Sequence, residues 1–276
     1  MNSPVNWVGG KSQISEDIIK LFPKHEVYIE PFFGAGWIFF RKEPSKVEII
    51  NDLNGSLVTF WKVLQDPVKN EEFQKRLTDM PCSEQLFEEY RSKVTWKDDI
   101  EQAVEFYYLI KNSFSARGMG TGEERFSGSS SRPKFGSFYN TDWKKICERF
   151  RGVCMFNRDA IDVIKGYDKP EHLIYLDPPY LMTRDTAEYY KFQDSFLHQR
   201  LLNALKELKY AKFILSYDYL PEIAETYKWC NMITVDMKYM LGNVKTSINN
   251  ERRERKEYII ANFDISGSAS LKRWCK

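Results

Sequence analysis

The sequence predicts an α/β protein with a Rossmann-like, mixed and mainly parallel sheet, interrupted by a mainly helical insertion that carries a β-hairpin. Two observations predict this class. Short apolar runs that end in a small-residue turn or an acid recur along the chain. Segments with the apolar spacing of helices lie between them. The length of 276 residues suffices for a full α/β core and a smaller second unit.

The Gly-rich turn at residues 30–36 is the first candidate binding element. Residues 14–21 have helical spacing, and residues 27–29 form a short predicted strand that runs into this turn. The turn reads Glu-Pro-Phe-Phe-Gly-Ala-Gly, and the apolar stretch 37–40 follows it. A strand followed by small residues lets a nucleoside cofactor approach the backbone closely.

A second strand is predicted over residues 47–52 and ends at Asp52, eighteen residues after Gly34. Rossmann-like folds place the carboxylate that binds ribose hydroxyls at this spacing. Phe39 stands where the third glycine of a dinucleotide motif would be. A cofactor with a nucleoside but no pyrophosphate therefore fits better than NAD.

The insertion is predicted between residues 55 and 151, so that residues 1–54 and 152–276 form one discontinuous domain. Asp66-Pro67 and Met80-Pro81 mark helix ends within it. Its predicted elements are helices within residues 53–111, among them 56–64, 84–90 and 100–110, then an irregular stretch with a hairpin up to residue 140, and a helix over 143–150.

The second half of the chain supplies the remaining elements of the sheet. The predicted strands are 153–156, 173–176, 213–217, 233–240 and 257–263, of which the last two alternate like an antiparallel pair, and the predicted helices are 160–164 and 199–208. Asp159 is either the N-cap of the first of these helices or a polar group offered to a cofactor adenine. His198 reads as a helix-start residue, with a base as the alternative.

The motif Asp177-Pro178-Pro179-Tyr180 is the strongest candidate for chemistry, because it follows a predicted buried strand. Two prolines cannot continue a central strand, so they fix the shape of the loop. The carboxylate and a prolyl carbonyl offer two acceptors to an exocyclic amine, and the tyrosine ring can stack on its heterocycle. An ordinary tight turn with an exposed acid is the structural alternative.

The segment from Trp7 to Ser12 contains Gly-Lys-Ser, as a phosphate-binding loop does. Val5 occupies the position of that motif's first glycine, and no clear strand precedes it, so a nucleotide triphosphatase is excluded. Trp7 and Lys11 read instead as an aromatic ring and a cation beside the Gly-rich turn. An N-terminal anchor is the other interpretation of Trp7.

Composition indicates a soluble protein without a metal centre. No apolar stretch has membrane-spanning length and no signal peptide opens the sequence, so we expect a cytoplasmic protein without a membrane partner. The five cysteines include no C-x-x-C pair. We therefore expect reduced, mostly buried thiols and no zinc.

Charge is distributed unevenly although the net charge is only +2. Residues 111–158 hold ten Lys and Arg residues and four Asp and Glu residues, whereas residues 70–110 hold five and ten. Aromatic residues alternate with the basic ones, a pattern typical of a surface that binds phosphates and reads bases, with a solvated charged face as the alternative. The candidate DNA-binding residues are Arg117, Arg125, Arg132, Lys134 and Tyr139, within a basic segment that also includes Phe138, Trp143, Lys144, Lys145, Arg149 and Arg151.

In this order, Trp7-x-Gly-Gly-Lys11, the Gly-rich turn, Ile50-Asn51-Asp52 and the Asp-Pro-Pro-Tyr loop resemble the Dam-type (class alpha, D12) DNA adenine-N6 methyltransferases. The similarity extends from about Trp7 to Phe263. The resemblance implies a Rossmann-like methyltransferase domain at 1–54 and 152–276 and a target-recognition domain at 55–151. It also implies that S-adenosylmethionine contacts Trp7, Lys11, Asp52 and Asp177, with Phe33, Gly34, Ala35 and Gly36 shaping its pocket.

The implied activity is that of a site-specific DNA-methyltransferase (adenine-specific), EC 2.1.1.72, in a bacterium or a phage. Asp177 and the carbonyl of Pro178 would accept the two amino hydrogens while Tyr180 stacks on an extruded adenine. Duplex DNA is the expected partner, and a restriction endonuclease is a further candidate.

Two other classes of function stay open. The first is an amino methyltransferase acting on cytosine N4, RNA or a glutamine amide, although such enzymes usually begin the loop with Ser or Asn. The second is a catalytically silent DNA-binding regulator. Asp52 and Asp177 favour the adenine enzyme, because a silent regulator would lose the cofactor acids.

Overall fold

The computed structural model describes residues 1–5, 11–78, 80–113, 126–127, 136–180, 195–237 and 255–266. In these ranges seven strands form one sheet, with the order β3-β2-β1-β4-β5-β7-β6. The strands are β1 (Val27–Glu30), β2 (Val47–Asn51), β3 (Cys154–Phe156), β4 (His172–Leu176), β5 (Lys212–Asp218), β6 (Asn231–Met237) and β7 (Arg255–Ala261). The predicted α/β class and mixed sheet are confirmed.

The strands β3, β2, β1, β4 and β5 are parallel, and β1 lies at the centre of this group. The chain runs outward from β1 through β2 to β3 and then returns to place β4 on the other side of β1. The order therefore reverses between β1 and β4. Open α/β sheets bind their ligands at the carboxyl ends of the strands at such a switch point.

The far edge of the sheet is antiparallel. β7 lies between β5 and β6 and runs opposite to both, with Asp218 paired to Glu257 and Val235 paired to Glu257 on the other side. The antiparallel pair was predicted correctly, although β6 begins two residues earlier, and β7 begins and ends two residues earlier, than the apolar alternation indicated. Residues 238–240 of the predicted strand lie outside the described residues.

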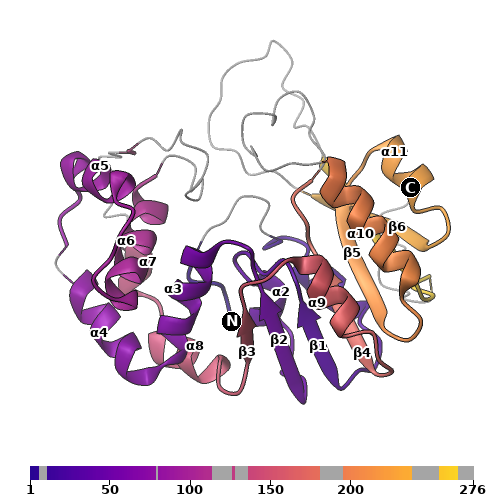
Figure 1. The fold of residues 1–276 in the computed structure, drawn as a ribbon, viewed down its shortest axis with the longest axis horizontal. Coiled ribbons are helices and arrows are strands. Elements are labelled where there is room, and N and C mark those ends of the chain that lie inside the picture. The colour runs from indigo at the N-terminus through magenta and orange to yellow at the C-terminus, as the bar shows by residue number, and fades with distance from the viewer. Residues whose placement is uncertain are drawn as a thin grey trace, which may run out of the picture.

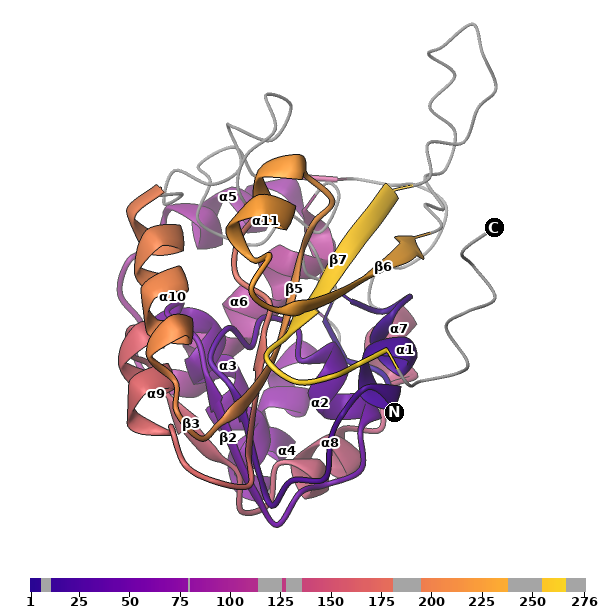
Figure 2. The ribbon, with the colours of Figure 1, turned by 90° about the vertical axis from the view of Figure 1, so that its right-hand side faces the viewer.

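Helices cover both faces of the sheet. On one face, α1 (Ser15–Lys20) and α2 (Trp37–Arg41) pack on Tyr28 and Tyr175. On the other face lie α9 (Ala160–Gly166), α10 (Ser195–Glu207) and α11 (Pro221–Thr226). Figure 2 shows the sheet between α9 and α10 on one side and α1 on the other. The buried strands therefore carry apolar residues on both faces.

The segment between β2 and β3 is helical and lies beside the β3 edge of the sheet (Figure 1). Asn54, Asp66, Ser83, Asp98 and Asp142 are side-chain N-caps in this segment. Such caps satisfy backbone N–H groups that the first helical turn leaves without partners. The helices of this segment are α3 (Gly55–Gln65), α4 (Pro67–Leu77), α5 (Glu84–Ser92), α6 (Asp99–Asn112), α7 (Gly136–Tyr139) and α8 (Trp143–Arg149).

Aromatic rings form the core of these helices. The ring of Phe60 stacks on that of Tyr107, with their centroids 5.8 Å apart. Phe73 and Trp143 meet edge to face at 5.3 Å. Phe138 also lies in this core. The interpretation of Phe138 and Trp143 as part of a base-reading surface is therefore wrong, because both side chains are buried.

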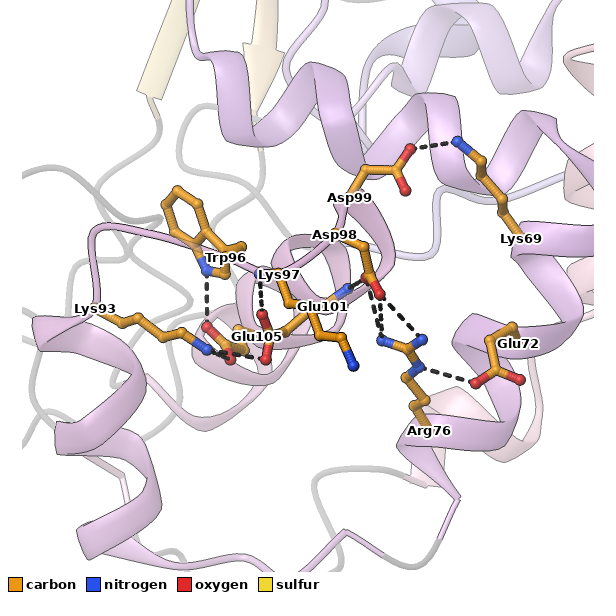
Figure 3. Close-up of polar contacts among 10 residues, drawn as sticks. All are labelled: Lys69, Glu72, Arg76, Lys93, Trp96, Lys97, Asp98, Asp99, Glu101 and Glu105. Carbon is orange, nitrogen blue, oxygen red and sulfur yellow. Dashed lines mark hydrogen bonds and ion pairs between the residues drawn. The ribbon is translucent and has the colours of Figure 1, made fainter.

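The outer surface of the same helices carries a network of ion pairs (Figure 3). Arg76 of α4 pairs with Glu72 and Asp98, which links α4 to the N-terminus of α6. Lys93, which follows α5, pairs with Glu101 and Glu105 of α6. Partly exposed pairs such as those of Arg76 contribute about 0–1 kcal/mol each, whereas Glu105 is buried. Arg76 and Lys93 are thus paired with acids of the same segment, and the acidic surplus of residues 70–110 remains.

Two further expectations need correction. Residues 136–139 form the short helix α7, where an irregular stretch with a hairpin was expected. Residues 114–125 and 128–135 lie outside the described residues, and an antiparallel bridge joins Ser113 to Phe126 at their borders. Cys82 and Cys154 are exposed, so the expectation of mostly buried thiols fails for these two.

Candidate active site

The carboxyl ends of β1, β2 and β3 are tied together by two asparagines. The side-chain amide of Asn51 donates to the carbonyl oxygens of Pro31, at 2.9 Å, and of Arg158, at 3.0 Å. The amide of Asn157 donates to the carbonyl oxygens of Asp52 and Leu53 at 2.8 and 3.0 Å. These bonds hold the turns that follow the three strands in register.

The Gly-rich turn connects β1 to α2 and contains two glycines with left-handed backbone. The φ angles of Gly34 and Gly36 are 49° and 65°. The indole N–H of Trp61 donates to the carbonyl of Gly34 at 3.2 Å. Phe33 is buried and meets Trp61 edge to face at 5.5 Å, so it supports the turn from the core side.

Replacing Gly36 with alanine is expected to lower the free energy of unfolding by about 1–3 kcal/mol, the range for strained backbone. An added Cβ would lie 2.4 Å from Cζ of buried Phe33, and φ is already unfavourable for a side chain. Denaturant titration measures the loss. Gly166→Ala is the matched control, because no atom lies within 4 Å of a Cβ there. Equal stability of the two variants would contradict the prediction.

Asp52 follows β2 and joins it to the Gly-rich turn. Its carboxylate accepts hydrogen bonds from the backbone N–H of Gly34 at 2.8 Å and of Asn54 at 2.9 Å. Burial raises the pKa of Asp52, and the backbone N–H donors offset part of this effect. The residue predicted to bind ribose therefore also determines the conformation of the turn.

The Asp-Pro-Pro-Tyr loop leaves β4 at the switch point. Oδ1 of Asp177 accepts from the Lys11 ammonium at 2.8 Å, and the Tyr180 hydroxyl lies 3.2 Å from the same oxygen. Among the described residues, none donates to Oδ2. The Asp177 side chain is 21% exposed. Within the described part of the chain, one oxygen is thus held by the protein and the other is left open.

Lys11 precedes α1 and is almost fully buried at 2% exposure. Its ammonium lies 3.6 Å from the carboxylate of Glu257 on β7 and 4.7 Å from the centroid of the Tyr180 ring. Burial lowers the pKa of Lys11, but Asp177 and Glu257 outweigh this effect and raise it overall. The site therefore holds two acids and one charged lysine.

The pKa of Asp177 is raised by burial, and Lys11 and Tyr180 offset part of the effect. Tyr180 stacks on Tyr217 of β5, with ring centroids 5.5 Å apart and planes inclined by 19°. The Tyr180 hydroxyl also lies 3.1 Å from Oε2 of Glu257. The loop is therefore connected to β5 and β7 as well as to Lys11.

The remaining predicted site residues are placed as follows. Asp159 is the N-cap of α9, accepting from the N–H of Ile161 at 2.8 Å, and also pairs with Arg200. His198 lies in the first turn of α10, where it contacts the Tyr217 hydroxyl. Tyr139 is 60% exposed. Outside the described residues lie Trp7, Arg117, Arg125, Arg132 and Lys134.

The sequence did not indicate a role for three side chains of this site, which are Glu257, Asn51 and Asn157. A glutamate at an inward position of an apolar strand, between Lys256 and Tyr258, was the available signal for Glu257. The asparagines follow the general rule that polar residues at the ends of parallel strands meet at one edge.

The sheet order and the acidic loop at the switch point define a class, the Rossmann-like methyltransferases. The chain belongs to the D12 class N6 adenine-specific DNA methyltransferase family, whose model matches residues 7–241. The resemblance noted from the motifs is therefore confirmed.

Named relatives agree with this family. The chain is 24% identical over 278 residues to the type II methyltransferase M1.LlaDCHI of Lactococcus lactis subsp. cremoris, covering 93% of this chain and 94% of that protein. It is 25% identical over 193 residues to the DNA adenine methylase of Salmonella typhi and 24% identical over 193 residues to that of Escherichia coli (strain K12), covering 67% of each chain in both cases.

Two features are absent from the described part of the chain. None of its helices is both long and apolar enough to cross a membrane. No cluster of three or more histidine, cysteine, aspartate or glutamate side chains suited to a metal ion occurs in the same ranges.

Proposed function

We propose that this chain is a site-specific DNA methyltransferase that transfers a methyl group from S-adenosylmethionine to the N6 amino group of adenine in duplex DNA, EC 2.1.1.72. The observation that carries the proposal is the open Oδ2 of Asp177. Lys11 and Tyr180 occupy Oδ1, so the carboxylate is oriented before substrate arrives. An exocyclic amine needs such an acceptor.

The charges of the site fit a cationic methyl donor. Asp177 and Glu257 carry two negative charges against the one positive charge of Lys11. This group of three side chains has a surplus of one acid, which suits a sulfonium cation. Trp7, Lys11, Phe33, Gly34, Ala35, Gly36, Asp52, Asp159 and Asp177 are proposed to hold the cofactor. The Asp159 assignment is the weakest of these, because its two oxygens already serve Ile161 and Arg200.

S-adenosylmethionine, when bound, supplies an electrophilic methyl group. The adenine amino nitrogen is a poor nucleophile, because its lone pair is delocalised into the ring. Asp177 and the carbonyl of Pro178 are proposed to accept the two amino hydrogens, which draws the lone pair out of conjugation with the ring and directs it toward the methyl group. Pro179 fixes the loop, and Tyr180 stacks on the base. Alignment then contributes more than covalent catalysis, and the extra proton leaves after transfer, when the alkylated nitrogen is acidic.

Catalysis and DNA recognition are proposed to belong to different parts of the fold. Residues 1–54 and 152–276 form the catalytic domain, and residues 55–151 form the target-recognition domain. The position of α3–α8 beside β3 supports this division (Figure 1). Since duplex DNA hides the amino group in the base stack, the adenine must be extruded. Proposed DNA contacts are Arg117, Arg125, Arg132, Lys134 and Tyr139. A restriction endonuclease partner stays a prediction.

The test is to express the protein in bacteria that lack adenine methylation and to sequence modified bases in their DNA. We expect N6-methyladenine at a defined sequence motif, and none in cells that express the Asp177→Ala variant. Methylation confined to cytosine, RNA or protein would refute the proposal. Tight DNA binding without methylation of any substrate would instead support the silent regulator.

A further inference from the structure

We propose that Glu257 is a positioning residue for methyl transfer, which holds Tyr180 and Lys11 so that Oδ2 of Asp177 stays open to the amino group. The inference rests on the proposed function. Glu257 is the third residue of β7, and its carboxylate reaches the switch point because β7 runs antiparallel to β5. It pairs in register with Asp218, the last residue of β5.

Glu257 is buried, with 2% of its surface exposed. A buried carboxylate costs free energy unless charged or hydrogen-bonding partners surround it. Among the partners of Glu257 in the described part of the chain, the Lys11 ammonium lies at 3.6 Å and the Tyr180 hydroxyl at 3.1 Å. Both partners also contact Asp177. The buried acid is therefore connected to the catalytic loop through two side chains.

Asp177 and Glu257 also share the same two donors. The Tyr180 hydroxyl has one proton, and the carboxylates of Asp177 and Glu257 both lie within its reach. Lys11 is likewise placed between the two acids. Without Glu257, both donors would lose one of these two acceptors and shift toward the other, Asp177, where they could occupy the oxygen that the substrate requires. The Tyr180 ring, which stacks on Tyr217, would also lose one of the two carboxylate contacts of its hydroxyl.

The experiment compares Glu257→Gln, Tyr180→Phe and the double variant with the wild type in kcat, KM for DNA and affinity for the methyl donor. Glu105→Gln is the matched control. Glu105 is 4% exposed and accepts from the Lys93 ammonium at 2.7 Å and the Trp96 indole at 2.8 Å, as Glu257 faces a lysine and an aromatic donor (Figure 3). It lies on α6, outside the site.

We expect Glu257→Gln to lower kcat by about 100-fold, the scale of a displaced reacting group, with KM for DNA nearly unchanged. Glu105→Gln should keep kcat within about threefold of wild type, since it contacts no part of the site. If Glu257 acts through the Tyr180 hydroxyl, the double variant should be no slower than the worse single variant, because effects of residues that act together do not add.

Three results would overturn the inference and leave the proposed function intact. These are Glu257→Gln behaving like Glu105→Gln, fully additive losses in the double variant, and a Tyr180→Phe variant with wild-type kcat. The last variant keeps the test decisive even if Glu257→Gln does not fold, since it breaks the same contact without touching the buried charge. A folded wild-type chain that methylates no adenine refutes the proposed function itself, and this inference with it.

Discussion

Replacing Asp177 with alanine is expected to reduce methyl transfer by at least about 1000-fold, the upper range for loss of one preorganised hydrogen-bonding group. The open Oδ2 is the acceptor for the substrate amine in our proposal, and Lys11 and Tyr180 lose their common partner when the carboxylate is removed. Affinity for duplex DNA should stay within about threefold of wild type, because the residue makes no phosphate contact in this proposal.

Single-turnover transfer of a labelled methyl group and a mobility-shift assay measure the two quantities. Asp162→Ala, an exposed acid on α9, is the control and should retain full transfer. In the wild type, transfer should fall as the pH drops through the raised pKa of Asp177, because the carboxylate must be ionised to accept. Transfer by the Asp177→Ala variant within tenfold of wild type would remove this residue from the chemistry.

Replacing Arg149 with methionine is expected to lower the free energy of unfolding by about 3–5 kcal/mol, the cost of removing one partner from a buried ion pair. Arg149 ends α8, and its guanidinium contacts Glu48 of β2, the carbonyl of Phe39 and the Phe39 ring. Glu48 also pairs with Lys42. These contacts join the helical insertion to the sheet.

The pKa of Glu48 tests the same network. Burial alone would raise this pKa, but Arg149 and Lys42 outweigh it, and the net shift is downward. Because the folded-state pKa lies below the unfolded value, the group stabilises the fold above the unfolded pKa. This contribution is lost as the pH falls through the folded pKa. The Arg149→Met variant should lack much of it.

Arg151→Met is the control for this prediction, because Arg151 is an exposed arginine two residues away. Denaturant titrations at neutral and acidic pH compare the two variants. If Arg149→Met instead keeps full stability and flattens the salt dependence of DNA binding by about one unit, Arg149 is a phosphate contact, as its place in the basic segment first suggested.

The strands and the catalytic loop could be predicted because their signals are local. Apolar runs bounded by turn residues define β1, β2, β4 and β5, and two prolines determine the backbone of the loop after Asp177. Asp66-Pro67 marked both the end of α3 and the start of α4, since the same aspartate caps the second helix. Such features depend on neighbours in the sequence only.

The partners of these elements could not be predicted, because they depend on the order of strands in space. Glu257 meets Tyr180 across 77 residues of sequence, and the contact follows from the insertion of β7 between β5 and β6. Arg149 and Arg151 look equivalent in a basic segment, yet one is buried against Glu48 and the other is exposed. Composition gives the number of charged residues in a segment, but not which of them are buried.

The place of β7 in the sheet also bears on how the protein is synthesised. β6 precedes β7 in the chain but lies outside it, so β5 has no neighbour on that side until β7 has left the ribosome. An unpaired strand edge is a template for association with other chains. The nascent protein therefore passes through a stage in which most of its core is present while one edge is open and Glu257 is absent. Conditions that slow translation between β5 and β7 should favour aggregation over the active fold.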